Sequence, residues 1–175
     1  MKERLAMTTT SKRLRAALVL ALLALQGCVH PVDFLKREFR SAGEHFAGFP
    51  EEVWAEHACD EKPLPYFKLE QNELLPRKLR AGDEFNHRFA YALCPTEPSA
   101  IVSGALDTVI LHRGKAIMRD DQARFELKPG RWVVDSFVVI PEAAEPGIYS
   151  LRLQFRGKPV RFQEDISFVV EPSGS

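Results

Sequence analysis

The sequence predicts a mainly β protein, an antiparallel β-sandwich of about seven or eight strands preceded by a short helical segment. The first observation is the period of the apolar side chains, which from about residue 66 changes from a helical period to a period of two. Alternation of this kind is clear in residues 85–93, 149–155 and 162–170. Successive side chains of a strand face opposite ways, so alternation is typical of an antiparallel strand with one buried face.

Two further runs, 106–111 and 132–140, are apolar and rich in β-branched residues, which favours well-buried strands. The second observation is the punctuation between runs. Turn-forming pairs separate the candidate strands, namely Arg113-Gly114, Pro129-Gly130 and Gly157-Lys158. Short strands with turn signals at this spacing predict a sandwich. A parallel α/β sheet is disfavoured because no helical pattern lies between the strands.

A helical stripe precedes the strands. Leu35, Phe39, Ala42 and Phe46 follow one another at spacings of four, three and four, which predicts one apolar helix face. This face either packs against the following domain or lies on a membrane with its basic flanks towards the headgroups. A second helical turn is expected over 50–55, where a proline and two acids occupy the first turn.

The N-terminus has the pattern of an export signal. Basic residues at positions 12, 13 and 15 precede an apolar run over 16–25, which Gln26, Gly27 and Cys28 follow. Ten apolar residues suit the central region of a signal peptide and fall short of the roughly 20 that a membrane-spanning helix needs.

Leu25-Gln26-Gly27-Cys28 resembles the lipobox of bacterial lipoproteins, although Gln26 is bulkier than the usual residue at its position. The resemblance implies removal of residues 1–27 as a signal peptide and attachment of fatty acyl chains, such as palmitate, to Cys28. The mature protein would then be a lipidated helical segment over 28–65 and a sandwich over 66–172. In the enteric sorting rule, Val29 favours the outer membrane. The alternative is an ordinary signal peptide followed by a chance cysteine.

The stretch from Ile140 to Leu151, Ile-Pro-Glu-Ala-Ala-Glu-Pro-Gly-Ile-Tyr-Ser-Leu, resembles the corner between two strands of bacterial immunoglobulin-like and fibronectin-type domains. The resemblance implies an immunoglobulin-like sandwich. It also implies a tyrosine corner, in which the Tyr149 hydroxyl bonds back to the backbone of the turn. The antibody-type Cys–Trp–Cys arrangement is missing, and a fold of this kind does not by itself define a function.

Cys59 and Cys94 are expected to form a disulfide, because an exported chain folds in an oxidising compartment. Residues 56–61 also gather potential metal ligands around His57, with His45 nearby. Zinc needs four such ligands in tetrahedral arrangement. Because Cys59 has a better partner in Cys94, we predict no metal site and keep His45 and His57 as the remote candidates.

Charge and motifs narrow the function classes. Removing five basic residues and one acid with residues 1–27 leaves 19 basic and 23 acidic residues, a net charge of −4, which argues against nucleic-acid binding. The sequence has no Gly-x-Ser-x-Gly motif and no phosphate-binding glycine loop, so no cofactor and no catalytic residue is assigned. Histidines 87 and 112 fall in strands, where a half-exposed cross-strand role is the usual one.

The leading hypothesis is a non-enzymatic lipoprotein of the cell envelope, facing the periplasm, whose sandwich binds or supports another envelope protein. The strand over 160–170 is expected at or beside a sheet edge, where a partner strand could add. Outward-facing polar side chains are expected to favour recognition, namely Arg88, Arg152, Gln154, Arg161 and Gln163. The alternatives are a periplasmic binder of metal or a small ligand, and an enzyme whose site the sequence does not reveal.

Overall fold

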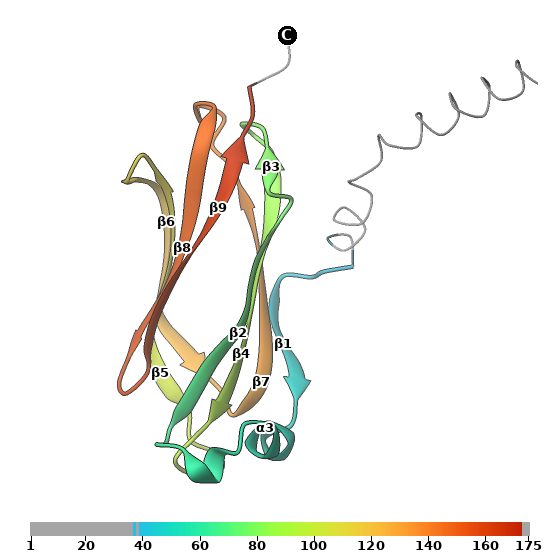
Figure 1. Cartoon of the computed structure of the whole chain (residues 1–175). Coiled ribbons are helices and arrows are strands. Elements are labelled where there is room, and N and C mark those ends of the chain that lie inside the picture. The colour runs from blue at the N-terminus through green and yellow to red at the C-terminus, as the bar shows by residue number, and fades with distance from the viewer. Residues whose placement is uncertain (1–36, 38, 173–175) are drawn as a thin grey trace, which may run out of the picture. The chain divides into compact units, whose positions relative to one another are not determined.

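The structure is a computed structural model that describes residue 37 and residues 39–172. Two β-sheets pack face to face, as Figure 1 shows, and this confirms the predicted mainly β sandwich. One sheet has four strands in the order β1 (Gly43–Gly48), β7 (Gly130–Val139), β4 (Glu84–Cys94) and β2 (Tyr66–Leu75). The other has five strands in the order β3 (Lys78–Leu79), β9 (Arg161–Val170), β8 (Gly147–Gly157), β5 (Val102–His112) and β6 (Lys115–Leu127).

The core lies between the sheets and is built from the alternating residues of the sequence pattern. From β4 it takes Phe85, Phe89, Tyr91 and Leu93. The facing strand β8 contributes a matching row, Tyr149, Leu151, Leu153 and Phe155. Each of these eight side chains is at most 3% exposed. The two-residue period therefore marks the buried face of both strands, as predicted.

The predicted tyrosine hydrogen bond is present at the start of β8. The Tyr149 hydroxyl donates to the carbonyl oxygen of Glu145 at 2.7 Å, which fastens the β7–β8 loop to the strand that follows it. The ring of Tyr149 stacks on His112 with centroids 4.2 Å apart. This end of the sandwich is thus held by a local contact that the sequence motif predicts.

The predicted helical turn is also confirmed, as helix α3 (Pro50–Glu56). Pro50 occupies the first turn, where its missing N–H costs nothing, and the Glu52 carboxylate accepts a hydrogen bond from the Phe49 N–H at 3.1 Å. A 3-10 turn, η2 (Cys59–Glu61), follows.

The expected helix that includes Phe46 is wrong. Residues 43–48 form strand β1, which pairs antiparallel with β7, and Phe39 is 88% exposed in a turn. Leu35 lies outside the described residues. The physical reason is that β7 offers an unpaired row of backbone groups, which β1 satisfies. Gly43, with a φ of 117°, also suits a chain reversal better than a helix interior.

The strand count and the boundary of the sandwich also differ from the expectation. Nine strands are present among the described residues, against the expected seven or eight, and β1 brings the four-stranded sheet back to residue 43 from the expected 66. The two-residue strand β3 pairs parallel with β9, unlike the antiparallel pairs elsewhere. No helix among the described residues is long and apolar enough to cross a membrane.

Candidate functional site

Cys28, the predicted lipidation site, and the predicted signal peptide over 1–27 lie outside the described residues. Their assignment remains a prediction from the sequence.

The predicted disulfide between Cys59 and Cys94 is present, with Cα atoms 6.4 Å apart. It joins η2 to the end of β4, and both residues are at most 1% exposed. Around it, Val53 of α3 and Ala92 of β4 form a small second core. The disulfide therefore fastens the helical segment to the four-stranded sheet, and its sulfur atoms are not available as metal ligands.

Potential metal ligands do meet near this disulfide, but in a different set from the one that the sequence suggests. Ligand atoms of Glu56, His57 and Glu70 lie within 4.8 Å of one another. His45 is not in this group; its Nε2 lies 2.8 Å from the backbone oxygen of Ser41. The sequence did not indicate Glu70, because it comes from β2 and reaches the helical segment only in the folded chain.

Arg131 already neutralises this group. Its Nε donates to Glu70 Oε2 at 2.6 Å, and its Nη2 donates to Glu56 Oε2 at 2.7 Å. The hydrogen bond from Arg131 lowers the pKa of Glu70 against the opposing effect of burial, and His57 adds a contact at 2.9 Å. Because a cation would have to compete with an arginine that engages both carboxylates, the arrangement is an ion-pair network and we assign no metal to it.

A second polar network is buried on the outer side of the four-stranded sheet. The side chain of Asp135 is fully buried and accepts two-pronged hydrogen bonds from Arg88, the shortest at 2.7 Å. Asn86 donates to the same carboxylate at 2.9 Å and accepts from Arg40 at 2.7 Å. Burial acts to raise the pKa of Asp135, but the hydrogen bonds from Arg88 and Asn86 outweigh it and hold the pKa below its usual value.

This network changes the expectation for Arg88 and attaches the chain before β1 to the sheet. Arg88 was expected to be an outward recognition residue, and the structure shows that it is committed to Asp135. Arg40, whose side chain is 7% exposed, ties the chain just before β1 to the sheet through Asn86 and Glu73.

A third polar group runs from the interior of the sandwich to an exposed glutamate, and it corrects the expectation for His87. This side chain is 1% exposed and faces the core between Phe85 and Phe89. Its Nε2 lies 2.9 Å from Asn72 Oδ1, and Asn72 donates to Glu164 at 3.2 Å. The glutamate that interrupts the apolar alternation of β9 is therefore the far end of a polar chain that links both sheets.

Acid is expected to destabilise the protein through His87. Burial lowers the pKa of His87 to about 4, and the charge of Asp135 opposes this shift. The unfolded chain, with a histidine pKa near 6.5, then binds one more proton than the native state between pH 6.5 and pH 4. Above pH 6.5 the histidine is neutral in both states and does not lower the free energy of unfolding. As the pH falls from 6.5 to 4, the free energy of unfolding decreases through this group by about 3 kcal/mol in all.

Urea unfolding from pH 7.5 to pH 4 measures this dependence, with the variant His87→Gln as the control. Carboxylates titrate in both proteins, so the difference between the two curves isolates the histidine. Parallel curves would show that the buried imidazole does not cause the loss.

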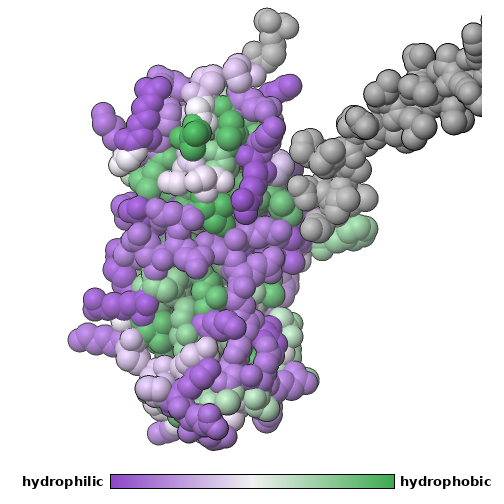
Figure 2. All heavy atoms as spheres, in the orientation of Figure 1, coloured by the Kyte–Doolittle hydropathy of each residue, from purple (hydrophilic) through white to green (hydrophobic). Residues whose placement is uncertain are grey.

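The outer face of the five-stranded sheet carries the other predicted recognition residues. Arg152 is held by Asp165 through hydrogen bonds of 2.8 and 2.9 Å, and these bonds lower the pKa of the aspartate. Arg156 contacts the buried Asp107 at 2.5 Å, an ion pair without the geometry of a hydrogen bond. Figure 2 views the sandwich with strands of both sheets in sight, and this side is mostly hydrophilic with separate hydrophobic patches. Paired charges of this kind keep a sheet face soluble and do not by themselves mark a binding site.

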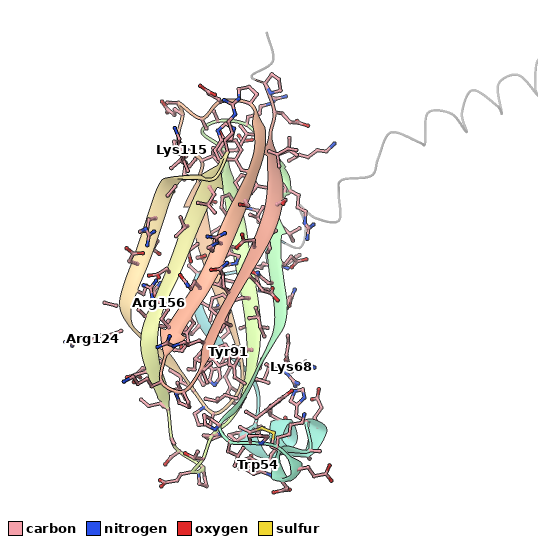
Figure 3. The ribbon with its side chains drawn as sticks, turned by 60° about the vertical axis from the view of Figure 1, so that its left-hand side comes forward. Trp54, Lys68, Tyr91, Lys115, Arg124 and Arg156 are labelled. Atoms are coloured by element: carbon pink, nitrogen blue, oxygen red, sulfur yellow. A yellow bond between two sulfur atoms is a disulfide. The ribbon has the colours of Figure 1, made fainter. Side chains whose placement is uncertain are left out.

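Strand β6 forms one edge of the five-stranded sheet, opposite β3, and is the feature that best fits partner binding (Figure 1). Its first ten residues are all exposed, and they include Ile117 at 41% and Met118 at 36%. A long exposed edge leaves backbone donors and acceptors without sheet partners. Figure 3 shows Arg124 pointing away from the sandwich beside this edge, and Lys115 at the opposite end of the strand.

The predicted edge, β9, is less open than β6. Strand β9 lies between β8 and β3, one strand in from the edge, which agrees with the prediction of a strand at or beside an edge. The short strand β3 pairs with Val169 and Val170. Over its first half, Phe162 stacks on Phe67 of the opposite sheet with centroids 4.8 Å apart. The sequence did not indicate β6, because residues 115–124 are mostly polar and show no two-residue alternation of apolar side chains.

Comparisons with known proteins leave the function open. No family model and no curated protein matches the chain. Among solved structures, an alkylpurine DNA glycosylase from Pseudomonas fluorescens is 15% identical over 61% of this chain and 30% of its own, with a TM-score of 0.45. A family 123 glycoside hydrolase from Clostridium perfringens is 15% identical over 53% and 22%, with a TM-score of 0.40. A β-glucosidase from Listeria innocua is 10% identical over 63% and 17%, with a TM-score of 0.45. The chain thus spans less than a third of each of these proteins, and no activity is inferred from the likeness.

Proposed function

We propose that this chain is a lipid-anchored, non-enzymatic protein of the bacterial cell envelope, whose sandwich binds another envelope protein by pairing β6 with an extended strand. The proposal that the sandwich binds a partner rests on the run of ten exposed residues on β6. Added strands gain affinity from backbone hydrogen bonds and specificity from alternate side chains. The anchor rests on the lipobox that ends at Cys28.

The distance between anchor and sandwich supports a partner close to the membrane. Arg40 lies twelve positions after Cys28 in the sequence, and its side chain has buried contacts to the sheet. A fully extended chain of that length spans at most about 43 Å. The point at which the chain joins the sandwich is therefore within about 43 Å of the anchor, which suits a partner that is itself embedded in the envelope or attached to it.

Mass spectrometry of the mature N-terminus tests the anchor. We expect a chain that begins at Cys28 and carries acyl groups, and we expect the variant Cys28→Ser to be unlipidated and released from washed membranes. Two or three acyl chains hold a protein stably on a bilayer, whereas one does not. An intact signal peptide or an unmodified residue 28 would contradict the lipoprotein assignment.

Site-specific photocrosslinking in membranes tests the edge. A photoreactive amino acid is placed at the alternate β6 positions Met118, Asp120 and Gln122, and at the matched exposed position Gln163 of β9 as the control. Strand pairing predicts crosslinks from β6 to one protein, at sites that step by two residues along its chain. Products from position 163 alone, or β6 products without the two-residue step, would contradict pairing through β6.

A further inference from the structure

The exposed part of β6 carries a balanced set of charges. We define the edge segment as residues 118–124, which contain the cations Arg119 and Arg124 and the anions Asp120 and Asp121. Arg119 lies 3.5 Å from Asp121 on the same strand, with half of each side chain exposed, so this pair is weak and free to exchange partners. All four charged residues therefore remain available to a strand placed alongside.

Only part of the edge segment pairs with β5 in an even register. The register of β5 against β6 is irregular between Gly104 and Leu106 and again between Ile110 and Leu111. Between these irregularities, residues 118–122 pair evenly with β5. A partner strand added to the outer side would find an evenly spaced set of backbone groups over these residues, and altered spacing beyond them.

The charges of the edge segment are complementary to the same segment running in the opposite direction. Two copies can pair antiparallel with Asp120 on the two-fold axis between them. Arg119 of each copy then faces Asp121 of the other, and the two copies of Asp120 face each other. If they pair about Gln122, Asp120 of each copy faces Arg124 of the other. Pairing about Asp120 keeps two pairs of opposite charge within the evenly spaced residues 118–122 and sets them against one pair of like charges. Pairing about Gln122 also gives two pairs of opposite charge and no facing like charges, but it uses Arg124, which lies beyond the evenly spaced residues.

We propose that the partner of β6 is a second copy of this chain, with the two β6 strands antiparallel and the two five-stranded sheets joined into one. This inference rests on the proposed function of the β6 edge and names its occupant. The buried interface of one strand pair is small, so the dimer is weak in dilute solution and forms on a membrane, where lipid anchors raise the effective concentration.

Cysteine crosslinking of the full-length lipidated chain in membranes tests this proposal. Single cysteines replace Met118, Arg119, Asp120, Asp121 and Gln122 in turn, with Gln163→Cys on β9 as the matched control. Mild oxidation should produce a disulfide-linked dimer with a maximum at one β6 position and lower yields on both sides of it. In an antiparallel pair, only the residue on the two-fold axis faces its own copy.

Charge reversal is the second part of the test, with the cysteine kept at whichever of positions 118 and 122 gives the higher dimer yield. Asp120→Lys with Asp121→Lys makes the edge segment wholly basic, and Arg119→Glu with Arg124→Glu makes it wholly acidic. Each variant alone should lower the dimer yield about tenfold, because like charges then face each other across the strands. Production of both variants in one cell should restore the dimer as a mixed pair. Lys158→Glu, on the β8–β9 turn, is the control and should leave the yield unchanged.

Every result decides the proposal. A position-dependent maximum, loss with either variant and recovery in the mixture support self-pairing through β6. Equal yields at position 163, no dimer at any position, or yields that ignore the charge reversals would overturn it. In those cases, a stepped photocrosslink from β6 to a different protein would still support the proposed function, and its absence would show that both proposals fail.

Discussion

Removal of the Cys59–Cys94 disulfide is expected to lower the free energy of unfolding by about 4 kcal/mol. The bond joins residues 35 positions apart, and a crosslink over a loop of that length removes about this much conformational entropy from the unfolded chain. Both cysteines are buried beside α3 and β4, so their loss also weakens the small core around Val53.

Denaturant unfolding of the double variant Cys59→Ala with Cys94→Ala measures this effect. Replacing both residues avoids a free thiol, and the wild type in strong reductant should approach the variant. We expect the lost stability to appear as a lower midpoint at nearly constant slope. A difference below about 1 kcal/mol would mean that the disulfide contributes little beyond the packing around it.

Replacement of Asp135 by asparagine is expected to lower the stability by about 3 kcal/mol. The substitution preserves shape and removes one negative charge from a fully buried carboxylate. Arg88, which has lost most of its hydration, then lacks its counter-charge. Arg40 keeps its ion pair with Glu73 but loses the attraction of the Asp135 charge. Removing one member of a buried pair costs more than the pair contributes, because the other charge stays desolvated.

Asp165→Asn is the matched control for Asp135→Asn. Asp165 accepts the same two-pronged contact from Arg152, but 38% of its side chain is exposed. Solvent screens such pairs, so the expected loss is below about 1 kcal/mol. Equal losses for the two variants would show that burial does not set the strength of the Asp135 network.

The sequence predicted the core best in strands that bury one face and expose the other. The alternating residues of β4 and β8 are the core residues, and the turn at Arg113-Gly114 has the positive φ values that a tight hairpin requires. It was least informative where contacts are distant in the chain. Phe46 fits a helical stripe by spacing, yet it lies 5.5 Å from Trp132 in a strand that completes the four-stranded sheet.

The candidate sites divide in the same way. The Cys59–Cys94 disulfide and the Tyr149 hydrogen bond follow from residue types and local motifs, and the structure confirms both. Glu70 and Arg131 join His57 from two other strands, and no spacing along the chain indicates that they meet. His87 looked half-exposed because a strand histidine usually is, and its burial depends on the second sheet that covers it.

By itself, then, the sequence determined a β-sandwich with a buried alternating face, its disulfide and its tyrosine hydrogen bond, because each depends on neighbours along the chain or on a simple period. The tertiary structure alone decided that residues 43–48 form a strand, that Arg131 contacts two carboxylates, and that β6 lies at an exposed edge of the five-stranded sheet. These outcomes depend on which strands lie side by side, and strand order is set by the packing of the two sheets as wholes.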